Sequence, residues 1–464
     1  MELFGYLGII HLLVITLKRF FMKRSLLLTL ALSLSTFPLF AAKSPKSIDK
    51  ALKSKESISL DKLKESRQSL WKLYKNKSSK DKKRLLEHSS KKITFAKHTM
   101  RYDYTKIGKV PKAGYPLYIA LHGGGSGPND WVNDSQWNHM KVYYAKAVKS
   151  GVYLAARGIN NTWNLHSRNE SYPMYDRLIE NMILFENVDP NRVYILGFSA
   201  GGDGTYQIAP RMADRFAAAN MSAGHHNGIS PRNLYNLPFL LQVGEYDKAY
   251  KRHQETVKFS QKLDAFQAQE KKGYVHQVNV HLGRGHNFLD NHPTSAKQSV
   301  LAKPNQWLKD DTVRSAKKVN SNAINWLDQY VRKPLPKRVI WDLKTRAERS
   351  ADELWSSNAR GRQSYWLADD ALSNEELIAK FSKKRNRFTV EKATESFRIL
   401  LSSKMVDFSK KIKVTIDGQK LSIKVTPTVK HSMQSLLDRG DKSYLFEASI
   451  QLEKAEDLWT VKAL

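Results

Sequence analysis

Three residues, in one order along the chain, indicate acyl-transfer chemistry. Ser199 lies in the pentapeptide Gly-Phe-Ser-Ala-Gly at positions 197–201, Asp247 follows it, and His286 comes last. A serine hydroxyl is a weak nucleophile near neutral pH, so it needs a base that takes its proton and an acid that orients the base. Serine, acid, histidine is the chain order found with a nucleophile elbow. The sequence therefore predicts Ser199 as nucleophile, His286 as base and Asp247 as acid.

The context of Ser199 makes this prediction specific. Gly-x-Ser-x-Gly alone is frequent in ordinary turns, but here an apolar run at 193–196 precedes it and a segment that can be helical follows. A sharp strand-to-helix turn puts the serine into strained backbone angles and needs glycines where strand and helix approach closely. We therefore expect the hydroxyl of Ser199 to stand clear of a sheet edge.

Acyl transfer also needs N–H donors for the oxyanion, each worth about 2.7–4 kcal/mol in the transition state. His122 and three glycines directly follow an apolar run at 116–121, and Ala200 directly follows the nucleophile. Loops of this kind supply the two donors in enzymes with a nucleophile elbow. We predict an oxyanion hole made by the N–H groups of Ala200 and of one glycine in the run 123–125, with Gly124 as first choice.

Other residues compete for the acid and base roles. Glu245 lies two residues before Asp247 and is the alternative acid. His276, His281 and His292 lie near His286 and compete for the role of base. His276 and His281 fall before or within a predicted strand instead of after it, so we interpret these two as structural.

Three further side chains are candidates for substrate binding. They are Trp163, Tyr246 and His225, the last of which is paired with His226 after a predicted strand. The histidine pair lacks a third ligand at helical or hairpin spacing, so the sequence predicts neither a metal site nor a cofactor.

The elements that must position these residues alternate between strands and helices. Such alternation predicts a mostly parallel sheet with helices on both faces. In these sheets reactive groups lie beyond the carboxyl ends of the strands, which is where every motif above falls. The predicted strands are 93–104, 116–121, 151–156, 193–196, 216–221, 239–243 and 278–282, with a helix over 175–185 and a turn at 189–192.

The pattern changes around Pro334, and the rest predicts a mainly antiparallel β-domain. The Asp417-Gly418 pair is a hairpin signal. Trp341, Tyr365 and Trp366 are interpreted as core residues, with stacking on a sugar ring as the alternative. The predicted strands are 339–343, 364–367, 387–390, 396–401, 411–416, 420–425 and 444–452.

Several of these motifs recur together in one known group of enzymes. They are Asp-Pro-Asn-Arg-Val-Tyr at 189–194, Gly-Phe-Ser-Ala-Gly-Gly-Asp-Gly at 197–204, Pro-Arg-Met-Ala-Asp-Arg-Phe at 210–216, the run 122–125, Trp163-Asn164, Asp-Lys-Ala-Tyr at 247–250 and Gly285-His286. About residues 95–340 resemble α/β-hydrolase esterases of the poly(3-hydroxybutyrate) depolymerase and feruloyl-esterase-like group. The resemblance implies an α/β-hydrolase fold and a serine carboxylic ester hydrolase. The polar stretch from Asn287 to about Asp311 is longer than this group leads us to expect, which leaves the substrate open.

The N-terminal region predicts export. Residues 22–42 combine a basic start, an apolar run and a small-residue end, as a signal peptide does. A second apolar run at 3–17 precedes it, so Met22 is the expected start, with an N-terminal membrane anchor as the alternative. We divide the chain into 1–42 (signal peptide), 43–92 (basic helical arm), 93–335 (α/β-hydrolase domain) and 336–464 (β-rich domain).

Composition limits the partners. The formal net charge is +33 and the chain has no cysteine, which excludes disulfides and thiolate chemistry. Lysines are spread along the whole chain and no nucleic-acid-binding motif is present, so we expect no nucleic-acid partner. The sequence predicts an exported enzyme, periplasmic or extracellular, acting on a small ester, a polyester or an acylated polysaccharide, with membrane contact only through an uncleaved N-terminal segment. The alternatives are a prolyl-oligopeptidase-like peptidase and a non-catalytic polysaccharide-binding protein on a hydrolase scaffold.

Overall fold

The computed structural model describes residues 45–125, 129–292, 300–301, 320–346, 362–370 and 375–464. Residues 43–464 form one compact unit. The predicted signal peptide and the apolar run before it lie outside the described residues, as does most of the polar stretch that ends near Asp311. In the described ranges, none of the helices combines the length and the apolar character that a membrane span requires.

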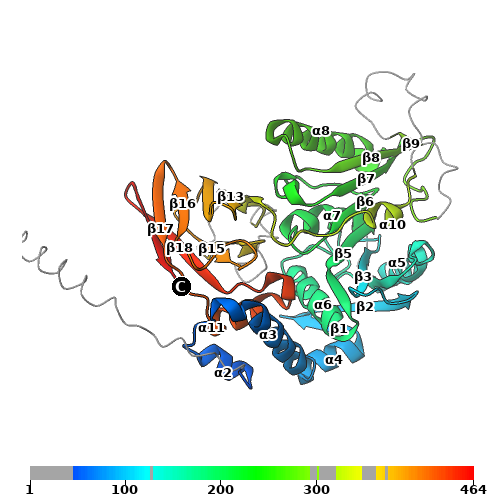
Figure 1. Ribbon diagram of the computed structural model, residues 1–464. Helices are drawn as coiled ribbons and strands as arrows, with labels where there is room; N and C mark the ends of the chain where they lie inside the picture. Colours follow the sequence, from blue (N-terminus) through cyan, green and yellow to red (C-terminus); the bar gives the residue numbers. More distant parts are fainter. Residues whose placement is uncertain (1–44, 126–128, 293–299, 302–319, 347–361, 371–374) are drawn as a thin grey trace, which may run out of the picture. The chain divides into compact units, whose positions relative to one another are not determined.

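A nine-stranded sheet forms the middle of the chain. Its strands lie in the order β1-β2-β4-β3-β5-β6-β7-β8-β9, seen in Figure 1 from β8 and β7 at the top to β2 and β1 below. Pairing from β4 through β8 is parallel, while β1, β2 and β9 join antiparallel at the two edges. The strands are β1 (Lys92–Phe95), β2 (His98–Ile107), β3 (Tyr115–Leu121), β4 (Gly151–Ala156), β5 (Val188–Phe198), β6 (Ala218–Ser222), β7 (Phe239–Gly244), β8 (His276–His281) and β9 (Val300–Leu301).

Both faces of this sheet are buried, as the near-continuous apolar strands require. On β3, Leu117 and Ile119 pack into one core with α6, α7 and α8, whereas Tyr118 and Ala120 pack into a second core with α5 and α10. Successive residues of a strand point to opposite faces, so one short strand serves both cores. The helices are α5 (Asp130–Tyr143), α6 (Ser171–Phe185), α7 (Ala200–Arg211), α8 (Arg252–Glu270) and α10 (Ala323–Leu327), with short 3-10 turns η2 (Ala145–Ala147), η3 (Arg232–Asn236) and η4 (Ala249–Lys251).

Two sequence predictions in this region are wrong in detail. The predicted strand 93–104 is a hairpin, β1 and β2, because Ala96 takes a left-handed backbone (φ 51°) that reverses the chain. The predicted turn at 189–192 is part of β5, which already pairs with β3 at Val188 and continues after a register shift.

The C-terminal part consists of two five-stranded sheets packed on a shared core. One has the order β10-β13-β14-β16-β17 and the other β11-β12-β15-β18-β19, and every pair is antiparallel except β14 with β16. Asp417 and Gly418, both with positive φ, make the predicted hairpin turn between β16 and β17. The elements are β10 (Arg338–Asp342), η7 (Leu343–Arg346), β11 (Gln363–Ser364), β12 (Leu367–Ala368), β13 (Glu376–Ser382), β14 (Arg387–Lys392), β15 (Ser396–Leu401), β16 (Ile412–Ile416), β17 (Gln419–Ile423), α11 (Val429–Arg439), η9 (Lys442–Tyr444), β18 (Ala448–Ala455) and β19 (Leu458–Ala463).

Three aromatic residues weighed for sugar stacking lie inside this core. Trp341, Tyr365 and Trp366 are at most 4% exposed, which excludes the stacking alternative. Residues 364–367 are not one strand, because Tyr365 has a positive φ (54°) between β11 and β12. The sequence also missed β13, β19 and α11.

The N-terminal helices, predicted as a basic helical arm, are packed against residues far along the chain. They are α2 (Ile48–Lys53), η1 (Leu60–Lys62), α3 (Leu63–Ser78) and α4 (Lys82–Ser90). On α3, Leu70 and Tyr74 are 1% exposed, and Arg67 pairs with Glu447 at 2.7 Å. Arg84 of α4 pairs with Glu180 of α6 at 2.8 Å. Helical spacing alone could not show that these faces have partners far along the chain.

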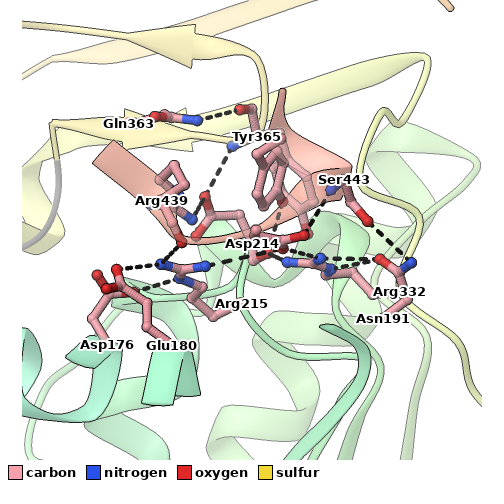
Figure 2. A network of polar contacts seen from close by, with 12 residues as sticks. Asp176, Glu180, Asn191, Asp214, Arg215, Arg332, Gln363, Tyr365, Arg439 and Ser443 are labelled. Atoms are coloured by element: carbon pink, nitrogen blue, oxygen red, sulfur yellow. Dashed lines mark hydrogen bonds and ion pairs between the residues drawn. The ribbon is translucent and has the colours of Figure 1, made fainter. Parts of the chain in front are cut away.

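A buried polar network joins the large sheet's helices to the C-terminal part (Figure 2). The carboxylate of Asp214 accepts from Arg439, and its carbonyl accepts from Arg332 and from the hydroxyl of Tyr444. Arg332 also donates to Asp441 (2.5 Å). Each of these charged side chains is at most 5% exposed. A buried charge without a partner is costly, and each of these charges has one. A defined set of polar contacts therefore holds the C-terminal part against the helices of the large sheet.

Candidate active site

Ser199 lies in a strained turn between β5 and α7. Its backbone angles are φ 59° and ψ −123°, which L-residues rarely adopt. A Cβ at Gly201 would lie 2.1 Å from the carbonyl oxygen of Leu121, so only glycine lets α7 approach β3 this closely. The N–H of Ser199 donates to the carbonyl of Ser222 at the end of β6 (2.9 Å). The elbow predicted from the sequence is therefore the local structure.

Ser199, His286 and Asp247 form one chain of hydrogen bonds. Nε2 of His286 is 2.9 Å from Oγ of Ser199, and Nδ1 is 2.9 Å from Oδ2 of Asp247. Since Asp247 is 1% exposed and His286 is partly exposed, the acid is sequestered behind the imidazole while the hydroxyl faces outward. A neutral imidazole that donates from Nδ1 to the acid can accept a proton at Nε2.

The alternative acid has another partner. Oε2 of Glu245 accepts from the N–H of Gly283 (2.6 Å), which braces the turn ahead of His286. Oδ1 of Asp247 makes no hydrogen bond with a described residue, and Nη1 of Arg252 is 3.8 Å away from it. Geometry thus favours Asp247 over Glu245 beside His286.

The other histidines weighed as bases have structural contacts. His281 is fully buried, its Nε2 is 3.0 Å from Oε1 of Gln242, and its ring stacks on Phe288 at 4.1 Å. His276 contacts Asp264. The carbonyl of His292 accepts from Asn322.

The glycine loop is fixed by two buried histidines that the sequence did not single out for this role. Nδ1 of His122 donates to the carbonyl of Gly123 (2.5 Å), and Nε2 of His166 donates to the carbonyl of His122 (3.0 Å). Burial lowers the pKa of His166 to about 3, and burial beside His166 lowers the pKa of His122 well below its ordinary value. Both rings are therefore neutral near pH 7.

The contacts of the glycine loop decide which of its N–H groups remain available to bind an oxyanion. The N–H of Gly125 donates to Oδ1 of Asn133 (2.9 Å). In a trans peptide the N–H points away from the carbonyl, so fixing the carbonyls of His122 and Gly123 also fixes the N–H groups of Gly123 and Gly124. Gly123 lies against the nucleophile, since a Cβ there would be 3.3 Å from Cβ of Ser199. The N–H of Ala200, in the first turn of α7, has no partner within the helix.

A cavity of about 460 Å³, called here the Phe198 cavity, opens beside the three residues. Its apolar walls come from Phe198, next to Ser199, from Phe288, two residues after His286, and from Tyr143 of α5. Gly123 reaches it from the glycine loop. The remaining lining residues are Gln136, His139, Met140, Arg284, Asn287 and Leu289.

The three predicted substrate-binding residues do not line this cavity. Trp163 is 44% exposed, borders the glycine loop at Gly125 and meets Tyr250 edge-on at 5.7 Å. Tyr246 is 49% exposed, beside Asp247. The N–H of His225 donates to Asp203 (2.6 Å). The aromatic walls of the cavity could have been predicted from the sequence. Phe198 directly precedes the predicted nucleophile, and Phe288 follows the predicted base by two residues.

His226 has a partner as well. Its Nε2 is 2.9 Å from Oε2 of Glu255. Across the described ranges, no three side chains of histidine, aspartate or glutamate gather in a way that could bind a metal ion.

Asp290 ties the His286 loop to the floor below Ser199. This fully buried carboxylate accepts hydrogen bonds from the hydroxyls of Tyr143 (3.0 Å), Tyr144 (2.8 Å) and Ser222. Burial raises its pKa, while the three donors favour the ionised form. Because the carbonyl of Ser222 accepts from the N–H of Ser199, one side chain braces both Ser199 and the loop that carries His286.

Replacement of Asp290 by alanine is therefore expected to impair both stability and turnover. The buried hydroxyls of Tyr144 and Ser222 lose an acceptor, at about 1–3 kcal/mol each when unsatisfied, while that of Tyr143 keeps its contact with the carbonyl of Phe288 (3.4 Å). We therefore expect the free energy of unfolding to fall by roughly 2–5 kcal/mol. Small displacements of catalytic groups can lower kcat about 100-fold. Urea unfolding and ester kinetics measure the two effects, and Asp290→Asn, which keeps one acceptor oxygen, should lie between. A wild-type kcat in folded Asp290→Ala would contradict the bracing role.

Asp203, close to Ser199, should make the free energy of unfolding depend on pH. It lies one turn after Ser199 and is 7% exposed. Burial raises its pKa from 3.8 to about 6, although the N–H of His225 and the cation of Arg252 favour its ionised form. Between pH 4 and 6 the folded state binds the proton that the unfolded state has released, so this group makes stability fall as the pH rises.

Asp203→Asn removes that dependence while retaining the acceptor oxygen for His225. We expect the variant to gain about 2–3 kcal/mol relative to the wild type between pH 4 and pH 7.5, because one pKa unit corresponds to about 1.4 kcal/mol. Urea unfolding of both proteins at the two pH values measures the difference. An unchanged difference would show that Asp203 does not titrate in this range.

Parts of this chain are similar to one enzyme family and to known esterases. Residues 146–331 match the dienelactone hydrolase family, a span that includes Ser199, Asp247 and His286. The chain is 29% identical over 103 residues to a bifunctional acetylxylan esterase/xylanase of Neocallimastix patriciarum, covering 22% of this chain and 15% of that protein. It is 27% identical over 110 residues to "Probable feruloyl esterase C" of Aspergillus terreus, covering 24% and 40%.

The chain thus spans less than half the length of the curated relatives it matches. Among solved structures, a thermostable esterase aligns with a TM-score of 0.36 and 22% identity over 52% of this chain and 63% of that one. The family match and the curated relatives confirm the resemblance to α/β-hydrolase esterases, and they support the prediction of a carboxylic ester hydrolase. The sheet order and the flanking helices confirm the predicted fold class.

Proposed function

We propose that this protein is a serine carboxylic ester hydrolase that works through an acyl-enzyme intermediate. The observation that carries the proposal is the pair of 2.9 Å contacts linking Ser199, His286 and Asp247. A strained serine at a strand end, a partly exposed imidazole and a buried acid are the parts that activation of a hydroxyl requires.

In the first step Nε2 of His286 takes the proton of Ser199 as Oγ attacks the ester carbonyl. The N–H of Ala200 and an N–H of the glycine loop, Gly123 or Gly124, bind the oxyanion. The imidazolium that forms is stabilised by the carboxylate of Asp247. It then protonates the leaving alcohol, and the bond between the carbonyl carbon and the alcohol oxygen breaks.

In the second step a water molecule takes the place of the alcohol. His286 removes its proton, the resulting hydroxide attacks the acyl carbon, and the tetrahedral intermediate releases the carboxylic acid and restores the hydroxyl of Ser199. The buried neutral histidines 122 and 166 act only through the loop backbone, as positioning residues.

The proposed setting is outside the cytoplasm, on an ester of a small molecule, a polyester or an acylated polysaccharide. The signal-like sequence at 22–42 supports export. The acetylxylan and feruloyl esterases named among the relatives support esters attached to polysaccharide.

The test is pre-steady-state hydrolysis of short-chain p-nitrophenyl esters by the full chain. We expect a burst of p-nitrophenol equal to the enzyme concentration, followed by slower turnover, because deacylation of an activated ester is slower than its acylation step. An organophosphonate should block the burst and label the peptide that contains Ser199. A folded protein with neither burst nor labelling would overturn the proposal.

A further inference from the structure

Arg284 lies in the turn between β8 and His286. Hydrogen bonds hold its backbone, while its side chain is unpaired among the described residues. The N–H of Arg284 donates to the carbonyl of His281 (3.3 Å), and its own carbonyl accepts from the N–H of Tyr246 (2.7 Å). The backbone is therefore held on both sides. Its side chain is exposed and makes no ion pair or hydrogen bond with any residue that the structure describes.

Exposed arginines are common, so position is what distinguishes this one. Arg284 lines the Phe198 cavity, together with Gly123 of the glycine loop and with Phe198 and Asn287, the chain neighbours of Ser199 and His286. A ligand group in this cavity is thus next to the carbonyl that Ser199 would attack. The described lining includes no aspartate or glutamate, so nothing there neutralises the guanidinium.

The walls beside this charge are aromatic. Phe198 and Phe288 pack together with ring centroids 5.2 Å apart, and Tyr143 of α5 also lines the cavity. They can contact the apolar part of a ligand whose charged group reaches the guanidinium. A guanidinium presents its N–H donors in a planar fork that matches a carboxylate.

We propose that Arg284 selects esters that carry a carboxylate close to the scissile bond. The guanidinium binds the carboxylate, and the aromatic walls of the Phe198 cavity contact the chain or ring that joins it to the ester. This inference rests on the proposed function, since it names the substrate class of that same site.

Matched pairs of esters test it. On the acyl side, 4-nitrophenyl hydrogen adipate is compared with 4-nitrophenyl hexanoate. On the alcohol side, 3-carboxyphenyl butyrate is compared with 3-carbamoylphenyl butyrate. We expect kcat/KM for the anionic member of at least one pair to exceed that of its neutral partner by roughly tenfold, carried mainly by KM, because the charge-assisted hydrogen bond forms when the ester binds. High salt should reduce the ratio.

Three variants separate the charge of Arg284 from general effects. In Arg284→Gln the ratio should fall to about one, and in Arg284→Lys it should be largely retained. Arg385→Gln removes the same charge from the exposed turn between β13 and β14 and should leave the ratio unchanged.

The outcomes are distinguishable. Turnover of neutral esters with no anionic preference in either pair would overturn this inference and leave the proposed function intact. A preference that persists in Arg284→Gln would overturn the role of this residue. No turnover of any ester would overturn the proposed function, and this inference with it.

Discussion

Replacement of Ser199 by alanine is expected to lower kcat for an ester substrate by about a factor of 10⁶. Without Oγ no acyl-enzyme can form, and the 2.9 Å contact to His286 is lost. His286→Ala should cost about as much, and the double variant little more, because nucleophile and base act as one unit. Steady-state hydrolysis of a p-nitrophenyl ester, measured down to the uncatalysed rate, gives all three values.

A matched control is Ser89→Ala. Ser89 is an exposed serine of α4 that hydrogen-bonds only its own helix, to the carbonyl of Leu86. We expect wild-type kcat and stability within about 0.5 kcal/mol. If Ser199→Ala kept more than a small fraction of the activity, another residue would have to be the nucleophile.

Replacement of Asp441 by alanine is expected to lower the free energy of unfolding by about 3–5 kcal/mol. Asp441 is fully buried and accepts from Arg332 at 2.5 Å, with Nη1 of Arg215 at 4.0 Å. Its removal leaves the buried guanidinium of Arg332 with only neutral acceptors, on Asn191 and on the Asp214 backbone. Urea unfolding at pH 7 measures the loss. Figure 2 shows the surrounding contacts.

The pH dependence of the loss, a surface control and a double variant each test the pairing of Asp441. Burial opposes ionisation, but Arg332 and Arg215 outweigh it and lower the pKa of Asp441, so its contribution should persist from neutral pH down to the ordinary carboxylate range and fade only below it. Asp438→Ala, on the exposed face of α11, should cost no more than about 0.5 kcal/mol. Adding Arg332→Met to Asp441→Ala should cost less than the sum of the single losses, because the unpaired charge disappears. Full additivity would contradict the pairing.

The sequence predicted that Ser199, Asp247 and His286 meet at one end of the large sheet, because the constraints there are local. Only glycine fits at position 201, where α7 crosses β3. Ser199, Asp247 and His286 each follow an apolar strand, and these strands end at the same edge of the sheet. Short buried strands without polar alternation were recognised for the same reason. Three residues distant in sequence therefore meet without any knowledge of the connecting loops.

The missed features depend on contacts between distant segments or on a single backbone angle. Nothing near Leu70 or Arg67 indicates that α3 packs, since Glu447 is 380 residues away. The positive φ of Ala96 and Tyr365 splits runs that alternate like single strands. The roles of His166 and Asp290 were hidden because their hydrogen bonds run to a backbone carbonyl and to three hydroxyls on other elements.

The pairing of Arg67 with Glu447 also orders events during synthesis. The docking site of α3 includes the carbonyl of Leu445 and the carboxylate of Glu447, so these contacts cannot form until synthesis has passed residue 447. At about 5–20 residues per second, roughly 20–80 s separate the emergence of the two partners. During that interval the apolar face of α3 is a site where a chaperone can bind or misassembly can begin. Docking of α3 is thus a late event, long after the helix itself has been made.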